Sequence, residues 1–179
     1  MIWFTADHHF GHTKIIQYCN RPFRFITDMN DSMIELWNLS IDKDDTVYHL
    51  GDFAFTNIAG TRKILETLHG KKYLFKGSHD KSAVKCKDMF EKIYISELIN
   101  VNDQFLFLAH HCHRVWPRSH YNVPHLFGHS HGGLNQYAES AGKLLDVGVD
   151  SHGFMPWSFD EVMKVMDSRP DNFNFIGNR

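Results

Sequence analysis

The chain has 179 residues, of which 42% are hydrophobic and 22% are charged, so we expect one domain over residues 1–179 with a substantial core. Its formal net charge of −2 at pH 7 argues against a protein that coats duplex nucleic acid through a broad basic surface. No apolar run approaches the roughly 18 residues that span a bilayer, and the first residues lack the pattern of a signal peptide, so the sequence predicts a cytoplasmic protein without a membrane partner.

Short apolar runs rich in β-branched and aromatic residues predict β-strands, and several of them end at Gly, Asp or His. In chain order these runs cover residues 2–6, 46–50, 72–76, 105–109, 125–127 and 143–149. Three helical patterns lie between or after them. The first can be capped by Asp28 or Asp31, the second covers residues 57–69, and the third follows Ser158, where Glu161 completes a capping box.

The order of these elements indicates the fold class. Strands and helices alternate in the first half of the chain, which predicts a parallel sheet. The closely spaced strands between Glu91 and Val149, with a hairpin turn expected at Asn102-Asp103, predict a second and more antiparallel part. The sequence therefore indicates an α/β or α+β protein.

Histidine is unusually frequent, with 14 residues in the chain, whereas the three cysteines lack any Cys-X-X-Cys spacing and indicate neither a disulfide framework nor a thiolate zinc site. Ligands of open α/β sheets bind at the carboxyl ends of the strands. The polar residues predicted at those ends are Asp7, His9, Asp52, Ser78, His79, His110, His129 and His131. Imidazoles mixed with carboxylates favour Mn, Fe, Zn, Ni or Co over Ca or Mg.

The spacing of these residues predicts two metal ions. Side chains alternate along an extended strand, so Asp7 and His9 should point to the same side and share one ion, and His129 and His131 should do the same. These two pairs exceed the needs of one tetrahedral ion. A carboxylate such as Asp52 can bridge two ions about 3.5–4 Å apart.

Five motifs in this order resemble those of the calcineurin-like metallophosphoesterases. They are Asp7-His8-His9, Gly51-Asp52, Gly77-Ser78-His79-Asp80, His110 and Gly128-His129-Ser130-His131. The resemblance implies an α/β fold of two packed mixed β-sheets flanked by helices, a four-layer sandwich. It also implies a hydrolase that cleaves phosphoester bonds with two divalent transition-metal ions, Mn first among them.

The resemblance also implies a role for each motif residue. One metal would take Asp7, His9, Asp52 and His131, and the other would take Asp52, Ser78, His110 and His129. A metal-bridging hydroxide would attack the phosphorus, and His79, held by Asp80 or by a backbone carbonyl, would protonate the leaving group. Because the chain is short and shows no large cap domain, we expect a small phosphodiester as substrate, and a nuclease is not supported by the charge.

Ser78 departs from the family pattern, which has Asn at that position. The Ser hydroxyl is shorter and a weaker neutral ligand than a carboxamide oxygen, so we expect a weakened second metal site. The alternative is that the hydroxyl or a fixed water serves equally well. A different class of function, a metal-stabilised binding scaffold with weakened catalysis, is the second hypothesis that Ser78 permits.

Several residues beside the motifs are further candidates for the site or its surroundings. We expect His110 rather than His111 to meet the metal, because adjacent strand residues point opposite ways and His110 directly ends the apolar run. His12, at an apparent helix start, and Arg114, in a basic loop, are candidate phosphate contacts, with solvent exposure as the alternative for each. Cys112 is expected to be a small apolar filler, and Trp116 to be core or to line the mouth of the pocket.

Overall fold

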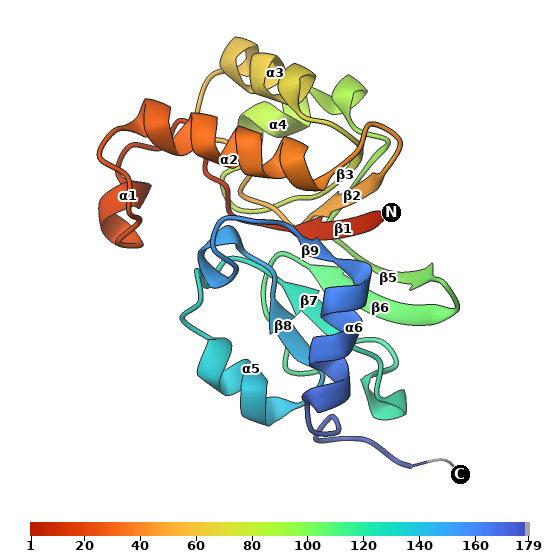
Figure 1. Cartoon of the computed structure of the whole chain (residues 1–179). Helices are drawn as coiled ribbons and strands as arrows, with labels where there is room; N and C mark the ends of the chain where they lie inside the picture. The colour runs from red at the N-terminus through yellow and green to blue at the C-terminus, as the bar shows by residue number, and fades with distance from the viewer. Residues whose placement is uncertain (178–179) are drawn as a thin grey trace.

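The structure, a computed structural model, describes residues 1–177 and contains two mixed β-sheets with helices on their outer faces (Figure 1). The first sheet has the order β4-β3-β2-β1-β9 and the second the order β5-β6-β7-β8. The strands of the first sheet are β1 (Ile2–Thr5), β2 (Thr46–His49), β3 (Lys71–Phe75), β4 (Lys92–Tyr94) and β9 (Trp157–Ser158). Those of the second are β5 (Ser96–Val101), β6 (Gln104–Ala109), β7 (His125–Phe127) and β8 (Leu144–Asp146). The expected α/β class with two mixed sheets is confirmed.

Each sheet contains both pairing directions. In the first, β1 to β4 pair in parallel and β9 pairs antiparallel to β1. In the second, β5 pairs antiparallel to β6, whereas β6, β7 and β8 pair in parallel. The hairpin turn predicted between β5 and β6 is confirmed, because Asn102 and Asp103 both adopt the left-handed backbone that tight hairpin turns require.

The helices are α1 (Ile15–Tyr18), α2 (Ile26–Ser40), α3 (Ile58–Thr67), α4 (Lys81–Lys85), α5 (Asn135–Ala141) and α6 (Phe159–Ser168). Three 3₁₀ turns, η1 (Lys87–Met89), η2 (Ser119–Tyr121) and η3 (Val149–Ser151), join other elements. The capping box of α6 is confirmed, since the Ser158 and Glu161 side chains each accept a hydrogen bond from the other's backbone amide. Asp28 and Asp31 do not cap α2. That helix begins earlier, at Ile26, so that Met29 is buried within its first turn.

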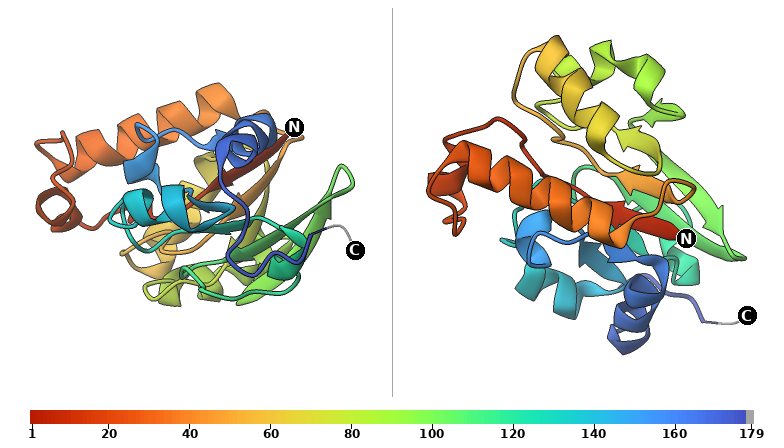
Figure 2. Two further views of the ribbon diagram at one scale, coloured as in Figure 1. Left: turned by 90° about the horizontal axis from the view of Figure 1, so that it is seen from below. Right: turned by 45° about the horizontal axis from the view of Figure 1, so that its top comes forward.

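Alternating residues along β1 show why the molecule is layered. Phe4 packs between the two sheets, in a cluster with Leu106 and Leu126 of the second sheet. Its neighbour Trp3 faces the other way and packs with Trp37 of α2. Figures 1 and 2 show α2, α3 and α4 on the side of the five-stranded sheet, and α5 on the side of the four-stranded sheet. The expected four-layer order of helices, sheet, sheet and helix follows from this alternation.

Within residues 1–177, no helix combines the length and the apolarity needed to cross a bilayer.

The motif segments follow directly on the carboxyl ends of five strands, β1, β2, β3, β6 and β7. The fold therefore brings the sequence-predicted site residues to one edge shared by the two sheets.

Candidate metal centre

The motif segments are held together by backbone hydrogen bonds that continue beyond the strands. The amide of Asp7 donates to the carbonyl of Gly51 at 2.9 Å, and the amide of His9 donates to the carbonyl of Asp52 at 3.0 Å. In the second sheet, the amide of Gly128 donates to the carbonyl of His110 at 3.0 Å. The loops after neighbouring strands thus lie side by side and bring their polar side chains together.

Five candidate ligands have a left-handed backbone. The φ angles are 60° at Asp7, 51° at His9, 55° at Asp52, 70° at His129 and 48° at His131. Our reason for pairing the ligands, the alternation of side chains along an extended strand, is therefore wrong, although the side chains do converge. Left-handed backbone is uncommon outside glycine, and such residues cluster where the surrounding structure holds them for function.

Asp52 lies at the middle of the cluster. Its Oδ2 atom is 3.5 Å from Nε2 of His9 and 3.5 Å from Nε2 of His110. Its Oδ1 atom accepts a hydrogen bond of 2.8 Å from the amide of His79. Burial raises the pKa of Asp52, but the His110 ring and the His79 amide lower it by a larger amount. The pKa of this carboxyl therefore lies below its usual range. One carboxylate oxygen therefore fixes a loop, and the other faces two imidazoles.

The two carboxylate oxygens of Asp7 also have different surroundings. Its Oδ2 atom accepts a hydrogen bond of 2.7 Å from the amide of His129. Its Oδ1 atom is buried, lies 4.0 Å from Nδ1 of His110 and has no hydrogen-bond partner among the described residues. Burial, with the nearby charges of Asp146 and Asp52, raises the pKa of Asp7 well above its usual value. A positive charge at this oxygen would relieve that repulsion.

The donor atoms fit divalent transition metals. Besides Asp7 Oδ1, the Nε2 atoms of His9 and His110 are buried and make no hydrogen bond within residues 1–177, although buried polar atoms are normally hydrogen-bonded. Ligand atoms lie within 4.8 Å of one another in the sets Asp7, His9, His131 and Asp7, Asp52, His110. Nitrogen and carboxylate donors together suit Mn, Fe, Co, Ni or Zn. The residues present can therefore hold metal ions at this edge.

Two residues that the sequence analysis did not single out orient the cluster. Asp150 Oδ2 lies 2.6 Å from Nδ1 of His131, which leaves Nε2 of that ring free to bind a metal. The buried guanidinium of Arg21 donates to both carboxylate oxygens of Asp150, each at 2.8 Å, and to the carbonyl of Asp7 at 2.7 Å. Arg21 and Asp150 are 129 positions apart, so no local pattern could have paired them.

Asp80 is placed differently from the catalytic position we expected. Its buried carboxylate accepts hydrogen bonds from three backbone amides, those of Asp52 at 2.9 Å, Phe53 at 2.8 Å and Gly77 at 2.7 Å. These bonds fasten the loop after β2 to the loop after β3, and the carboxylate does not hold the His79 ring. Asp80 is therefore a positioning residue for the two loops, and the expectation that its carboxylate holds the catalytic His79 imidazole is wrong.

Asp146 plays the same part in the second sheet and was also missed. Its carboxylate accepts hydrogen bonds from the Ser130 hydroxyl at 2.6 Å and from the amides of Gly132 at 3.0 Å and Gly148 at 2.8 Å. The turn that carries His129 and His131 is thereby fixed. The strand β8 ends at Asp146 and not at the expected residue 149, because the Asp146 carboxylate accepts a hydrogen bond from the amide of Gly148 and so bends the chain after the strand.

His79 and Ser78 lie at the exposed rim of the cluster. The His79 ring is 5.5 Å from that of His9, centroid to centroid, and both line a cavity of about 640 Å³ together with Asp52 and His131. Ser78 lines a smaller cavity of about 280 Å³ together with His110. The structure thus places His79 beside the expected first metal and Ser78 beside the expected second.

Of the two expected phosphate contacts, only His12 reaches the cavity. Nδ1 of His12 lies 3.4 Å from Nδ1 of His9, and its ring stacks on Phe55. No helix amides accompany it, because α1 begins three residues later, at Ile15. Arg114 is exposed and lies over the ring of Phe173, so the structure does not bring it to the motif residues.

Cys112 and Trp116 lie away from the ligand groups, whereas the sulfur of Cys19 lies within 4.8 Å of ligand atoms of His131 and Asp150. Burial raises the pKa values of the Cys19 and Cys112 thiols to about 11. Cys112 packs against an apolar cluster that contains Phe107 and Trp116, as expected of a filler. Trp116 is buried there and donates to the carbonyl of Val123, so it belongs to the core and not to a pocket mouth.

The two mixed sheets carry a cluster of imidazoles and carboxylates at their shared edge. No family model matches the chain. The chain belongs to the family of the uncharacterized protein MJ1445 of Methanocaldococcus jannaschii, with which it is 30% identical over 175 residues, 93% of this chain and 91% of that protein.

Two solved structures match the chain to different extents. The protein of unknown function AQ665 from Aquifex aeolicus has a TM-score of 0.70 and 25% identity, over 92% of this chain and 98% of that one. The phosphoesterase YfcE from E. coli has a TM-score of 0.48 and 16% identity, over 82% of this chain and 77% of that one. The similarity to AQ665 therefore extends over nearly the whole of both chains.

Proposed function

We propose that the protein hydrolyses phosphoester bonds at a centre of two divalent transition-metal ions. One observation carries the proposal: three buried atoms that can ligate a metal make no hydrogen bond within residues 1–177. They are Asp7 Oδ1, His9 Nε2 and His110 Nε2, and both Nε2 atoms lie 3.5 Å from Asp52 Oδ2. With the ions bound, such a centre would attract a phosphate oxyanion, stabilise its developing charge and activate water. Asp7, His9, Asp52 and His131 would hold one ion, and Asp52, His110 and His129 the other.

His79 is the proposed acid for the leaving group. Its amide is fixed by Asp52 Oδ1, and its exposed ring lines the same cavity as His9 and His131. An imidazole there can act as a general acid and give a proton to the departing oxygen. His12 lines the cavity as well and is the proposed contact for a phosphate oxygen.

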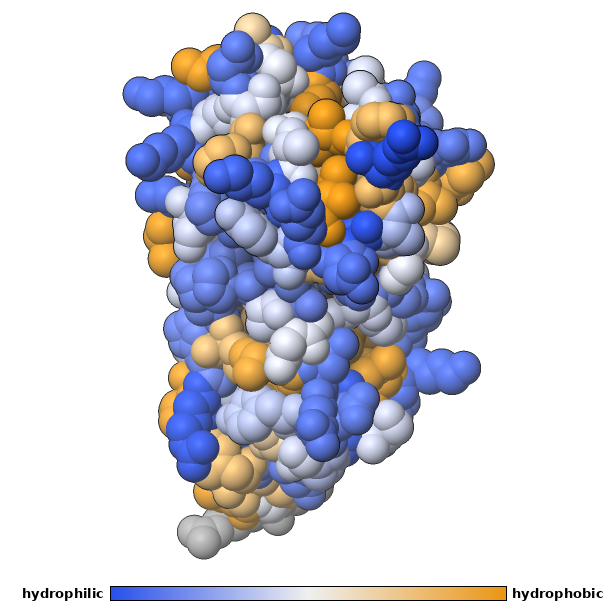
Figure 3. Space-filling view, turned by 90° about the vertical axis from the view of Figure 1, so that its left-hand side faces the viewer, coloured by the Kyte–Doolittle hydropathy of each residue, from blue (hydrophilic) through white to orange (hydrophobic). Residues whose placement is uncertain are grey.

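An adjoining groove supports a phosphodiester with an organic leaving group as the substrate. The groove has a volume of about 960 Å³ and is lined by Phe55, Ile58 and His79, with Lys81 and Lys85 also among its lining residues. Phe55 and His79 line the motif cavity too, so the two spaces meet on the proposed leaving-group side. Phe55 is 51% exposed and Ile58 48% exposed, and Figure 3 shows apolar surface on this side of the molecule. Exposed apolar patches of this kind mark binding surfaces.

The test is hydrolysis by metal-free protein resupplied separately with Mn, Fe, Co, Ni, Zn or Mg. The substrates are bis(p-nitrophenyl) phosphate as a diester and p-nitrophenyl phosphate as a monoester. We expect activity only after resupply with a transition metal, a higher rate on the diester, and a large loss in Asp52→Asn but none in the surface control Asp88→Asn. Full activity in the stripped protein would exclude the two-metal proposal.

A second candidate function rests on Ser78. Its side chain is exposed and its hydroxyl makes no hydrogen bond within residues 1–177, so the second ion gains only a weak donor there. A protein that binds both metals and a phosphate ester but turns over none of the substrates would be the metal-stabilised binding scaffold.

A further inference from the structure

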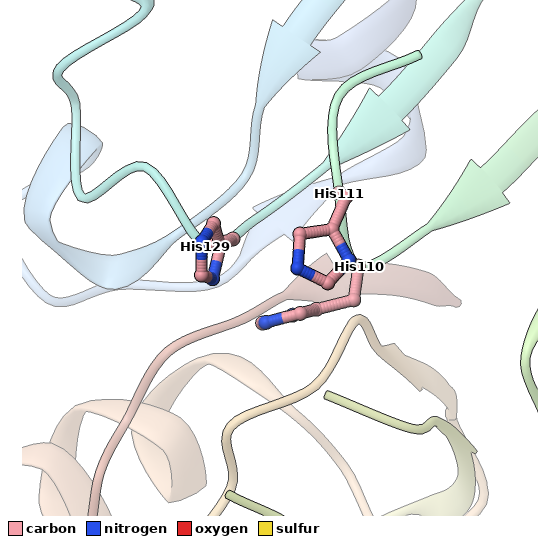
Figure 4. A group of neighbouring side chains, drawn as sticks. All are labelled: His110, His111 and His129. Atoms are coloured by element: carbon pink, nitrogen blue, oxygen red, sulfur yellow. The ribbon is translucent and has the colours of Figure 1, made fainter. Parts of the chain in front are cut away.

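Three histidines converge beside Ser78. His110 directly follows β6, His111 is the next residue, and His129 follows β7. Their ring centroids are 4.8 Å apart for His110 and His111, 4.4 Å for His111 and His129, and 5.0 Å for His110 and His129. One ring nitrogen from each lies within 4.8 Å of the others. Figure 4 shows the three rings turned toward the same space between the two loops.

The position of His111 differs from our expectation that it points away from the metal. That expectation assumed an extended strand through both histidines, but β6 ends at Ala109. Beyond that residue the alternation of side chains no longer applies, and the ring of His111 lies against the ring of His129. The His111 imidazole also makes no hydrogen bond within the described part of the chain, so its nitrogens are available.

His111 and Ser78 line the same cavity of about 280 Å³, together with His110. A serine hydroxyl reaches less far than a longer side chain and is a weak neutral donor, so an ion held by Asp52, His110 and His129 would lack a strong fourth ligand. An imidazole nitrogen is a strong ligand for transition metals. We propose that His111 is a direct ligand of the second metal and completes the site that Ser78 leaves short.

This inference rests on the metal centre of the proposed function but not on hydrolysis. The experiment is therefore a titration of metal-free protein with Co²⁺, followed by visible absorption and by equilibrium binding. We expect His111→Ala to weaken the second Co²⁺ by at least about tenfold and to alter its absorption, with the first Co²⁺ unchanged. The matched control is His120→Ala, which removes an imidazole that lies against Tyr121, 4.2 Å from ring to ring, and should leave both steps unchanged.

A second variant tests whether a metal ligand at position 78 can replace His111. Ser78→Asn supplies a carboxamide oxygen in the cavity that His111 also lines, so it should restore the second Co²⁺ in the His111→Ala background. Its effect in the parent protein should be smaller. Because His111 is exposed, neither variant removes a core contact, and circular dichroism should confirm the fold.

The outcomes separate the two proposals. Unchanged Co²⁺ binding in His111→Ala would overturn the role of His111 and leave the two-metal centre standing. An equal loss at both Co²⁺ steps, or no restoration by Ser78→Asn, would also overturn it. A parent protein that binds no Co²⁺ would instead remove the metal centre, and the proposed function with it.

Discussion

Replacing Asp80 with alanine removes the acceptor that joins two of the motif loops. The carboxylate accepts hydrogen bonds from the amides of Asp52, Phe53 and Gly77, and its side chain is fully buried. In Asp80→Ala these three donors keep their burial but lose their partner. A methyl group offers no acceptor, so the three buried amides must stay unsatisfied or the loops must open to water.

The expected loss is large compared with the stability of a domain. An unsatisfied buried donor costs about 1–3 kcal/mol, so three donors give a loss of about 3–9 kcal/mol in the free energy of unfolding. A single domain typically has about 5–15 kcal/mol in total. We therefore expect Asp80→Ala to be marginally folded or unfolded at 25 °C, with the metals lost as a consequence.

Urea unfolding followed by circular dichroism measures this loss as a fall in the midpoint at constant slope. The matched control is Asp88→Ala, which removes an exposed carboxylate paired with Arg62 and should leave the midpoint nearly unchanged. Asp80→Asn keeps one acceptor oxygen and should fall between the two. A loss below about 1 kcal/mol in Asp80→Ala would refute the reasoning, because no single unsatisfied donor would then be present.

Four further outcomes are expected. Asp52→Asn should lower the occupancy of both metals more than any single histidine change, and elemental analysis showing two ions per chain would contradict its bridging role. His79→Ala should lower turnover by roughly 10²–10⁴ on esters with poor leaving groups and much less on activated aryl esters; an equal loss on both, or a change in metal content, would point to a structural role. Phe55→Ala should lower kcat/KM for diesters with large apolar leaving groups but not for small ones, and an equal effect on both would exclude the groove as their site. Burial lowers the pKa of His125 from 6.5 to about 3, so between these pH values the unfolded chain binds a proton that the folded chain does not, and stability falls as the pH falls. His125→Gln, which keeps a donor and an acceptor, should flatten that dependence by up to about 1.4 kcal/mol per pH unit between pH 6 and 5 in urea unfolding, and an unchanged slope would contradict it.

Local patterns explain the parts of the fold that the sequence predicts well. The strand at His125–Phe127 and the helix after Ser158 depend on short apolar runs and on a cap within three residues, and both are observed. The two-residue strand β9 carries no such period, since Trp157 and Ser158 pair with β1 only because the chain returns there. Its formation depends on long-range packing that no window of sequence contains.

Some features of the candidate site are also visible in the sequence, whereas others depend on the folded structure. Residue types and spacing identify the ligand candidates because Asp and His carry their chemistry with them. The left-handed backbone at Asp7 and His9 is not visible in the sequence, so the geometric reason we gave for their pairing was wrong. The Arg21 and Asp150 pair and the turn of His111 toward His129 depend on contacts between distant segments or on where a strand ends, and both were missed.

The hydrogen bond from the amide of His129 to the carboxylate of Asp7 has a consequence for the order of events during synthesis. These two residues are separated by 122 positions, and the hydrogen-bonded residues Arg21 and Asp150 are separated by 129. Chains are made from the amino terminus, so the first motif leaves the ribosome long before the partners that fix its side chains. A nascent chain that ends before residue 150 lacks a carboxylate that fixes this cluster, so we expect the proposed metal centre to form only after that residue has been made.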